Sequence, residues 1–129
     1  SRMDGRLDHM KPVRLEDVPD LKLILPGSQN ARRPNLDSYL ERNRIEVSAV
    51  LELDAMMGTL ELVAQSDWCT ILPGALCIPD VIPGARCLNP LTDAPPTEYV
   101  MIQAKSGRLS MGAQLFADII QKEFDRQVQ

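Results

Sequence analysis

Residues 21–27 read Leu-Lys-Leu-Ile-Leu-Pro-Gly, a short apolar run closed by a turn dipeptide. A run of this length that ends at Pro-Gly is typical of a buried strand followed by a turn. Two further β-rich apolar runs lie at residues 47–53 and 69–72, and the second of them is also closed by Pro-Gly. A fourth run is Tyr99-Val100-Met101-Ile102. The sequence therefore predicts four short strands.

Helical periodicity occupies the intervals between these strands. Pro34 suits the first turn of a helix over residues 34–43, because a missing N–H is tolerated there. Residues 55–65 repeat apolar side chains at helical spacing after Asp54, a residue type that caps helices. A last helix should cover residues 110–126, with the serine at its start as cap. Strands separated by single helices predict a three-layer α/β fold with a mostly parallel sheet.

Two segments of different composition frame the first three strands. Residues 1–20 are polar and charged without an apolar period, so we expect an extended lead-in. Residues 73–96 contain six of the ten prolines, which excludes helix over most of the segment. That segment should be a loop, with a short edge strand possible only at residues 86–88.

Charge and composition exclude several classes of protein. The 129 residues include 14 basic and 18 acidic side chains, giving a net charge of −4 and a pI near 4.9. Domains that bind the phosphate backbone of nucleic acids are usually basic. Because this chain is acidic, we expect no direct binding of DNA or RNA. No apolar run reaches the length of about 18 residues that a membrane span needs. Since the chain also lacks a charged-then-apolar start, we expect no signal peptide and a cytoplasmic location.

The residues that could carry chemistry are few. Cys69, Cys77 and Cys87 are odd in number, and the spacing between them does not provide the four close ligands of a zinc site. We expect Cys69 to pack in a strand and the other two to lie in a loop, in a reducing compartment. His9 should be a solvated surface residue of the lead-in. With no nucleophile–base pair evident, we expect no metal, no cofactor and no catalytic residue.

Basic and soft side chains gather near the predicted strand ends. Arg32 and Arg33, with Arg42 and Arg44, form either a solvated helix face or an anion contact, because guanidinium groups pair well with carboxylates. The Met56-Met57 pair is either core or the lining of an adaptable pocket. In parallel α/β sheets, ligands bind at the carboxyl ends of the strands, so both features lie where a ligand would be expected.

Three stretches occur in the order and spacing of one known family. Residues 63–73 read Val-Ala-Gln-Ser-Asp-Trp-Cys-Thr-Ile-Leu-Pro, residues 15–27 lead into the first strand, and residues 99–104 precede Arg108-Leu109-Ser110 and an apolar helix. Over residues 12–126 the chain resembles the effector-binding domain of LysR-type transcriptional regulators. It departs at Ser66 and Trp68, where the family usually has glycine, so the local turn and pocket wall should differ.

The resemblance implies the second lobe of a type 2 periplasmic-binding-protein-like fold. Residues 1–20 would be a lead-in or hinge, residues 21–96 the lobe, and residues 97–129 a return strand and C-terminal helix. The family's winged helix-turn-helix and most of its first lobe have no counterpart in this sequence. Family effector domains commonly pair side by side, with the outer helix and adjacent strand at the interface. The candidate dimer-surface residues are Leu36, Tyr39, Leu40 and Val47.

The function implied by the resemblance is effector sensing without catalysis. A small effector, an organic acid or aromatic carboxylate, would control transcription through DNA-binding domains that this sequence lacks. We expect it to contact the free N–H groups at the start of helix 55–65, and an N–H and a hydroxyl from the loop after the first strand. The candidate effector-binding residues are Gly27, Ser28, Leu53, Asp54, Ala55, Met56 and Pro73.

Some alternatives remain open at this stage. Asp54 would repel an anionic effector, and capping the helix is its alternative role. The chain could instead be a stand-alone periplasmic-type solute-binding protein, which an upstream helix-turn-helix would exclude. A small α/β enzyme is the third class, which turnover of a carboxylate or ester would support.

Overall fold

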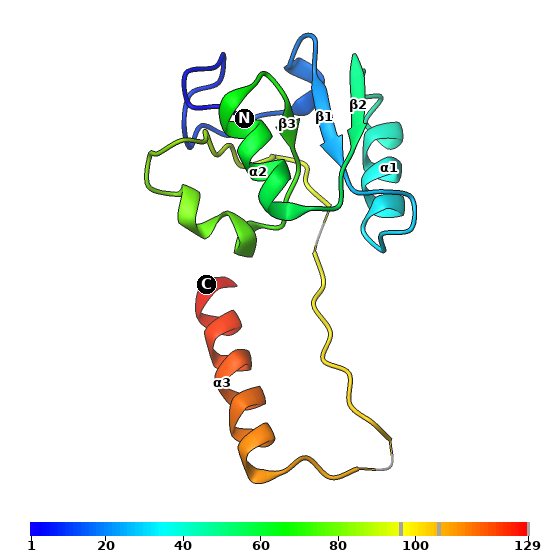
Figure 1. The fold of residues 1–129 in the computed structure, drawn as a ribbon, viewed down its shortest axis with the longest axis vertical. Helices are drawn as coiled ribbons and strands as arrows, with labels where there is room; N and C mark the ends of the chain where they lie inside the picture. The colour runs from blue at the N-terminus through cyan, green and yellow to red at the C-terminus, as the bar shows by residue number, and fades with distance from the viewer. Residues whose placement is uncertain (96, 106, 129) are drawn as a thin grey trace. The chain divides into compact units, whose positions relative to one another are not determined.

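The computed structural model describes residues 1–95, 97–105 and 107–128. They fall into two compact units, Ser1–Pro96 and Thr97–Gln129. The first unit contains a sheet with two α-helices, and the second contains a long helix (Figure 1). Among the described residues, no helix is both long and apolar enough to cross a membrane.

A three-stranded parallel sheet forms the centre of the first unit (Figure 1). β1 (Lys22–Leu25) lies in the middle, between β2 (Ala49–Glu52) and β3 (Cys69–Thr70). Both neighbours pair with β1 in parallel, so the three strands predicted in this unit and their direction are confirmed. Each strand is shorter than the apolar run that predicted it. At β1 the cause is Pro26, which has no N–H to continue the ladder.

Two helices flank this sheet (Figure 1). α1 (Arg33–Arg42) connects β1 to β2 and has Pro34 in its first turn, as predicted. α2 (Met56–Gln65) connects β2 to β3. Because these right-handed crossovers lead to opposite sides of β1, they place the helices on opposite faces of the sheet. The α/β class with a parallel sheet is therefore confirmed.

The core of the first unit lies between α1 and one face of β1. Leu23 and Leu25 of β1 are almost fully buried there, together with Leu36 and Tyr39 of α1. Ile24 points to the opposite face, since successive strand side chains alternate, and it is equally well buried. β1 is therefore buried on both of its faces.

The N-terminal segment is packed along the proline-rich segment. The N–H of Met10 donates to the carbonyl of Leu88 at 2.7 Å, and the N–H of Val13 donates to that of Pro90 at 2.9 Å. Leu15 begins the short 3-10 helix η1 (Leu15–Asp17) and belongs to the core. The predicted lead-in is therefore an integral part of the unit, because the unpaired backbone of residues 86–92 offers it hydrogen-bond partners.

His9 is bound into this junction, so the prediction of a solvated surface histidine is wrong. Its Nδ1 accepts a hydrogen bond from the N–H of Leu88 at 3.2 Å, and its Nε2–H donates to the carbonyl of Val81 at 2.9 Å. The imidazole is half-buried and joins two backbone groups that no β-ladder satisfies.

The proline-rich segment is more ordered than predicted. It contains η2 (Gly74–Asp80), a 3-10 helix that tolerates Pro79 because such short turns need few backbone donors. The Arg86 guanidinium pairs with the Asp80 carboxylate at 2.8 Å and closes the loop that follows. At the position of the possible edge strand, Arg86 forms a single antiparallel bridge with Arg2.

The three cysteines are free thiols. Cys69 lies half-buried in β3 against the core, as predicted, while Cys77 lies in η2 and Cys87 is fully buried in the loop. Burial raises the pKa of the Cys69 and Cys77 thiols, because a thiolate loses hydration inside the protein.

These raised pKa values predict slow alkylation. At about pH 8, iodoacetamide should modify Cys69 and Cys77 more slowly in the folded chain than in denaturant, because the thiolate is the nucleophile. The rate in the folded chain should also keep rising at pH values where the unfolded thiols have already levelled off. Peptide mass spectrometry measures both profiles, and coinciding profiles would contradict the burial of these thiols.

The second unit contains α3 (Met111–Val128), which confirms the helix predicted over residues 110–126. The Ser110 hydroxyl accepts a hydrogen bond from the N–H of Ala113 at 3.2 Å, as a cap should. The strand predicted at residues 99–102 is not formed. A strand is completed by hydrogen bonds to a neighbour, and none of the described residues provides one. Tyr99 instead packs on Phe124 of α3, with ring centroids 5.0 Å apart.

Candidate functional site

A small hollow opens at the carboxyl end of the sheet, between β1 and β3. The ends of these strands contribute Ile24, Leu25, Pro26, Thr70 and Leu72. The following loops and the start of α2 contribute Asn30, Arg32, Leu53, Asp54, Met56 and Thr59. The empty volume is about 330 Å³, part of it open solvent. In a sheet of order β2-β1-β3 this is the point where the chain turns to opposite faces, which is where open α/β sheets bind ligands.

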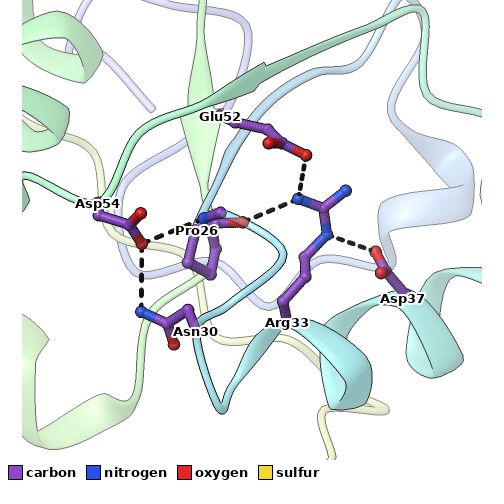
Figure 2. A network of polar contacts seen from close by, with 7 residues as sticks. Pro26, Asn30, Arg33, Asp37, Glu52 and Asp54 are labelled. Atoms are coloured by element: carbon purple, nitrogen blue, oxygen red, sulfur yellow. Dashed lines mark hydrogen bonds and ion pairs between the residues drawn. The ribbon is translucent and has the colours of Figure 1, made fainter.

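One peptide group beside the hollow is held from both ends (Figure 2). The carbonyl of Pro26 accepts a hydrogen bond from Nη1 of Arg33 at 2.8 Å. The N–H of the same peptide belongs to Gly27 and donates to Oδ1 of Asp54 at 3.1 Å. With both its carbonyl and its N–H bonded, this peptide cannot rotate freely, so the loop after β1 has a fixed shape.

Asp54 faces this loop and does not cap α2, so the predicted capping role is wrong. Ala55 occupies the N-cap position, without a side-chain cap. The Asp54 Oδ1 also accepts a hydrogen bond from the side-chain amide of Asn30 at 3.3 Å (Figure 2). A Cβ at position 27 would lie 2.8 Å from Asp54 Oδ2, so a larger residue there would force the Asp54 carboxylate to shift. Two donors from the β1 loop therefore outcompete the local preference for a cap.

Arg33 has a structural role at the rim of the hollow. Its guanidinium binds Asp37 at 2.8 Å and Glu52 at 2.7 Å, in addition to the Pro26 carbonyl (Figure 2). Hydrogen bonds to Asp37 and then Glu52 raise the pKa of Arg33 further above its ordinary value. Because these contacts join α1, β2 and the β1 loop, the Arg33 side chain is already satisfied and is not free for a ligand.

Arg32 is arranged differently from its neighbour. It lines the hollow, and Nη2 donates to the carbonyl of Ile71 at 3.3 Å. Among the described residues it forms no ion pair, although it is half-buried. The other half-buried basic residues of the described chain all pair with a carboxylate; they are Arg2, Lys22, Arg33 and Arg86. Arg32 thus brings to the hollow a positive charge that has no ion-pair partner among the described residues.

A family model described as LysR substrate binding domain matches residues 4–125, nearly the whole chain. The chain belongs to this family. No solved structure matches it. LysR substrate-binding domains are the sensing parts of transcriptional regulators, so the resemblance noted in the sequence is confirmed and the chain is part of a regulatory family.

The structure brings three predicted site residues of this LysR domain into the hollow, namely Leu53, Asp54 and Met56. Gly27 adjoins them, but its N–H already binds Asp54 and is not free for an effector. Three predicted residues do not line the hollow: Ser28 and Ala55, which are exposed, and Pro73, which is half-buried. The other eight lining residues were not among the candidates; four of them are polar, namely Asn30, Arg32, Thr59 and Thr70. Only Arg32 had a sequence signal, as a possible anion contact.

The predicted dimer-surface residues of the LysR domain lie in or against its core. Leu36 and Tyr39 are buried against β1, and Leu40 and Val47 pack on the same cluster. Leu36 and Tyr39 therefore cannot form an outer surface. They belong to the apolar stripe of α1, which the helix buries against its own sheet.

Proposed function

We propose that this LysR domain senses a small carboxylate-containing effector, which binds in the hollow between β1 and β3. Arg32 carries the proposal, because it is the half-buried basic residue that lacks an ion pair in the described chain. A guanidinium presents paired donors that match a carboxylate, and burial strengthens such contacts relative to water. The apolar walls formed by Leu53, Met56 and Leu72 suit the hydrocarbon body of an organic or aromatic acid.

Two further polar groups can orient the effector. The Thr59 hydroxyl lines the hollow and makes no hydrogen bond to the described residues. The first turn of α2 adds backbone N–H groups and the positive end of its dipole. An effector held by these groups would connect the β1 loop to α2, and so would favour one arrangement of the lobe and its attachments over another.

The wider role follows from the same proposal. The unit Ser1–Pro96 would be one lobe of a type 2 periplasmic-binding-protein-like domain, with residues 1–20 packed along it and residues 97–129 leading to the other lobe. Effector binding would be transmitted to DNA-binding domains outside this chain, in the cytoplasm where the promoter is. The regulatory family favours this role over a stand-alone solute-binding protein.

We also propose self-association through the exposed edge of the sheet. β2 is an edge strand whose Val50 and Leu51 are exposed, and an unpaired strand edge is a template for pairing with another chain. This surface belongs to the strand of the predicted interface, but it consists of exposed side chains of β2 and not of residues packed in the core.

The Arg32→Ala variant tests the proposed site. Removing a charge-assisted contact should weaken the binding of carboxylates by about 10- to 100-fold. The measurement is a titration of the full chain with a panel of aliphatic and aromatic carboxylates, amino acids included, followed by amide chemical shifts. Binding should shift residues 24–32 and 53–59 in the original chain.

Arg42→Ala is the matched control, since Arg42 is exposed at the end of α1 and lies outside the hollow. It should bind the panel like the original chain. Equal losses in both variants, or shifts confined to residues 74–95, would show that the site lies elsewhere.

A further inference from the structure

Two opposite charges lie in the hollow without neutralising each other. Arg32 and Asp54 both line it, and neither takes part in an ion pair within the described part of the chain. They are the charged residues of the lining, whose remaining members are apolar or neutral polar. The lining of the hollow therefore carries one positive and one negative side chain.

The Asp54 carboxylate uses only one of its two oxygens in hydrogen bonds to the described residues. Oδ1 accepts the hydrogen bonds from the Gly27 N–H and the Asn30 amide, which fix the orientation of the group. Oδ2 receives no hydrogen bond from the described residues. The Cβ that glycine lacks at position 27 would lie 2.8 Å from Oδ2, so any larger residue there would crowd this oxygen.

From this pairing we infer that the effector is a zwitterion of the amino-acid type, with its carboxylate on Arg32 and its protonated amine on Asp54. The inference rests on the proposed function and narrows its ligand class. A simple carboxylate would leave Asp54 beside a second negative charge, which opposes binding. A simple amine would leave Arg32 unpaired. A zwitterion satisfies both groups at once.

The rest of the lining restricts the ligand's side chain. Leu53, Met56 and Leu72 provide an apolar wall, and the lining contains no third charged residue. A charged ligand side chain would therefore be desolvated without a partner, which opposes binding, whereas an aliphatic or aromatic side chain would pack on the apolar wall. The lining therefore favours amino acids with uncharged side chains, such as leucine or phenylalanine.

Matched compounds test the inference on the full chain. Each proteinogenic amino acid is titrated, and leucine and phenylalanine are compared with isocaproate and hydrocinnamate, which lack only the amine. Isoamylamine and phenethylamine lack only the carboxylate. An uncharged amino acid should bind at least about tenfold more tightly than its deaminated acid, as expected for one hydrogen bond to a charged group.

The outcomes separate this inference from the proposed function. Deaminated acids that bind as tightly as the amino acids would overturn the zwitterion and leave the carboxylate site intact. The same holds if other carboxylates of the panel bind and no amino acid does. If no carboxylate of either class binds, both proposals are overturned.

The Asp54→Asn variant supplies the second measurement. Asparagine keeps an oxygen to accept the Gly27 N–H, so the loop should keep its shape while the charge is lost. Amino-acid binding should fall by about tenfold or more, and binding of the deaminated acid should stay constant or improve. Asp17→Asn, at an exposed position outside the hollow, makes the same change of charge and should alter neither. Unchanged amino-acid affinity in Asp54→Asn would overturn the inference.

Discussion

Replacement of Leu23 by alanine is expected to lower the free energy of unfolding by about 2–5 kcal/mol, the range for a buried leucine. Leu23 has no exposed surface and lies in the central strand, between partners on both sides. Its side chain belongs to the cluster that joins β1 to α1, so truncation leaves a cavity that a central strand cannot collapse to fill. Since the total free energy of unfolding of a small domain is about 5–15 kcal/mol, this single change should remove much of the stability.

Val50→Ala provides a matched control for Leu23→Ala. Val50 is the register partner of Leu23 on β2, but 49% of it is exposed. Its truncation should change the free energy of unfolding by less than about 1 kcal/mol. Urea denaturation followed by circular dichroism compares the two variants. A larger loss for Val50→Ala than for Leu23→Ala would mean that the core does not lie where the structure places it.

Features set by neighbouring residues could be predicted from the sequence. The apolar run at residues 21–25 gave β1 and its burial on both faces, and Pro26 marked its end. Pro34 gave the start of α1 in the same way. In each case, the deciding feature is local: either proline lacks the N–H that would continue a strand or helix, or apolar residues follow one another within a few positions.

Features set by distant residues could not be predicted in this way. Asp54 reads as a cap, but its donors Gly27 and Asn30 lie 27 and 24 positions earlier in the chain. Arg32 and Arg33 are adjacent residues of the same type. The Arg33 guanidinium donates hydrogen bonds to Asp37, Glu52 and the Pro26 carbonyl, whereas Arg32 lines the hollow. Local propensity cannot rank such contacts, because each requires the assembled sheet to bring its partners together.

The missing strand at residues 99–102 has the same explanation. Tyr-Val-Met-Ile has strong β propensity, but propensity for a strand measures how well side chains fit a pleated, half-buried surface. No such surface is present in the unit Thr97–Gln129, where the described residues form one helix. The sequence therefore shows that residues 99–102 are of strand-forming types, but it cannot show whether a strand lies beside them to pair with.

The 129-residue chain is expected to self-associate through α3. This helix has two opposite faces. One contains exposed apolar side chains, namely Leu115, Phe116, Ile119 and Ile120. The other is polar, with hydrogen bonds from Gln114 to Asp118 and from Gln121 to Asp125 at the i, i+4 spacing. Because each large apolar side chain contributes about 1.5–3 kcal/mol when buried, such a face favours association over exposure to water.

The double variant Phe116→Gln/Ile119→Gln should abolish this association. Glutamine is a good helix former, so α3 should keep its helicity in circular dichroism while its apolar face is interrupted. Sedimentation of the original chain should give a mass that rises above 14.4 kDa with concentration, and the double variant, which lacks the α3 contact, should give a lower mass at each concentration. Gln114→Ala/Gln121→Ala, on the polar face, should associate like the original chain. A monomeric original chain with rapid amide exchange throughout residues 112–124 would contradict the prediction, because it would show that water alone covers the apolar face of α3.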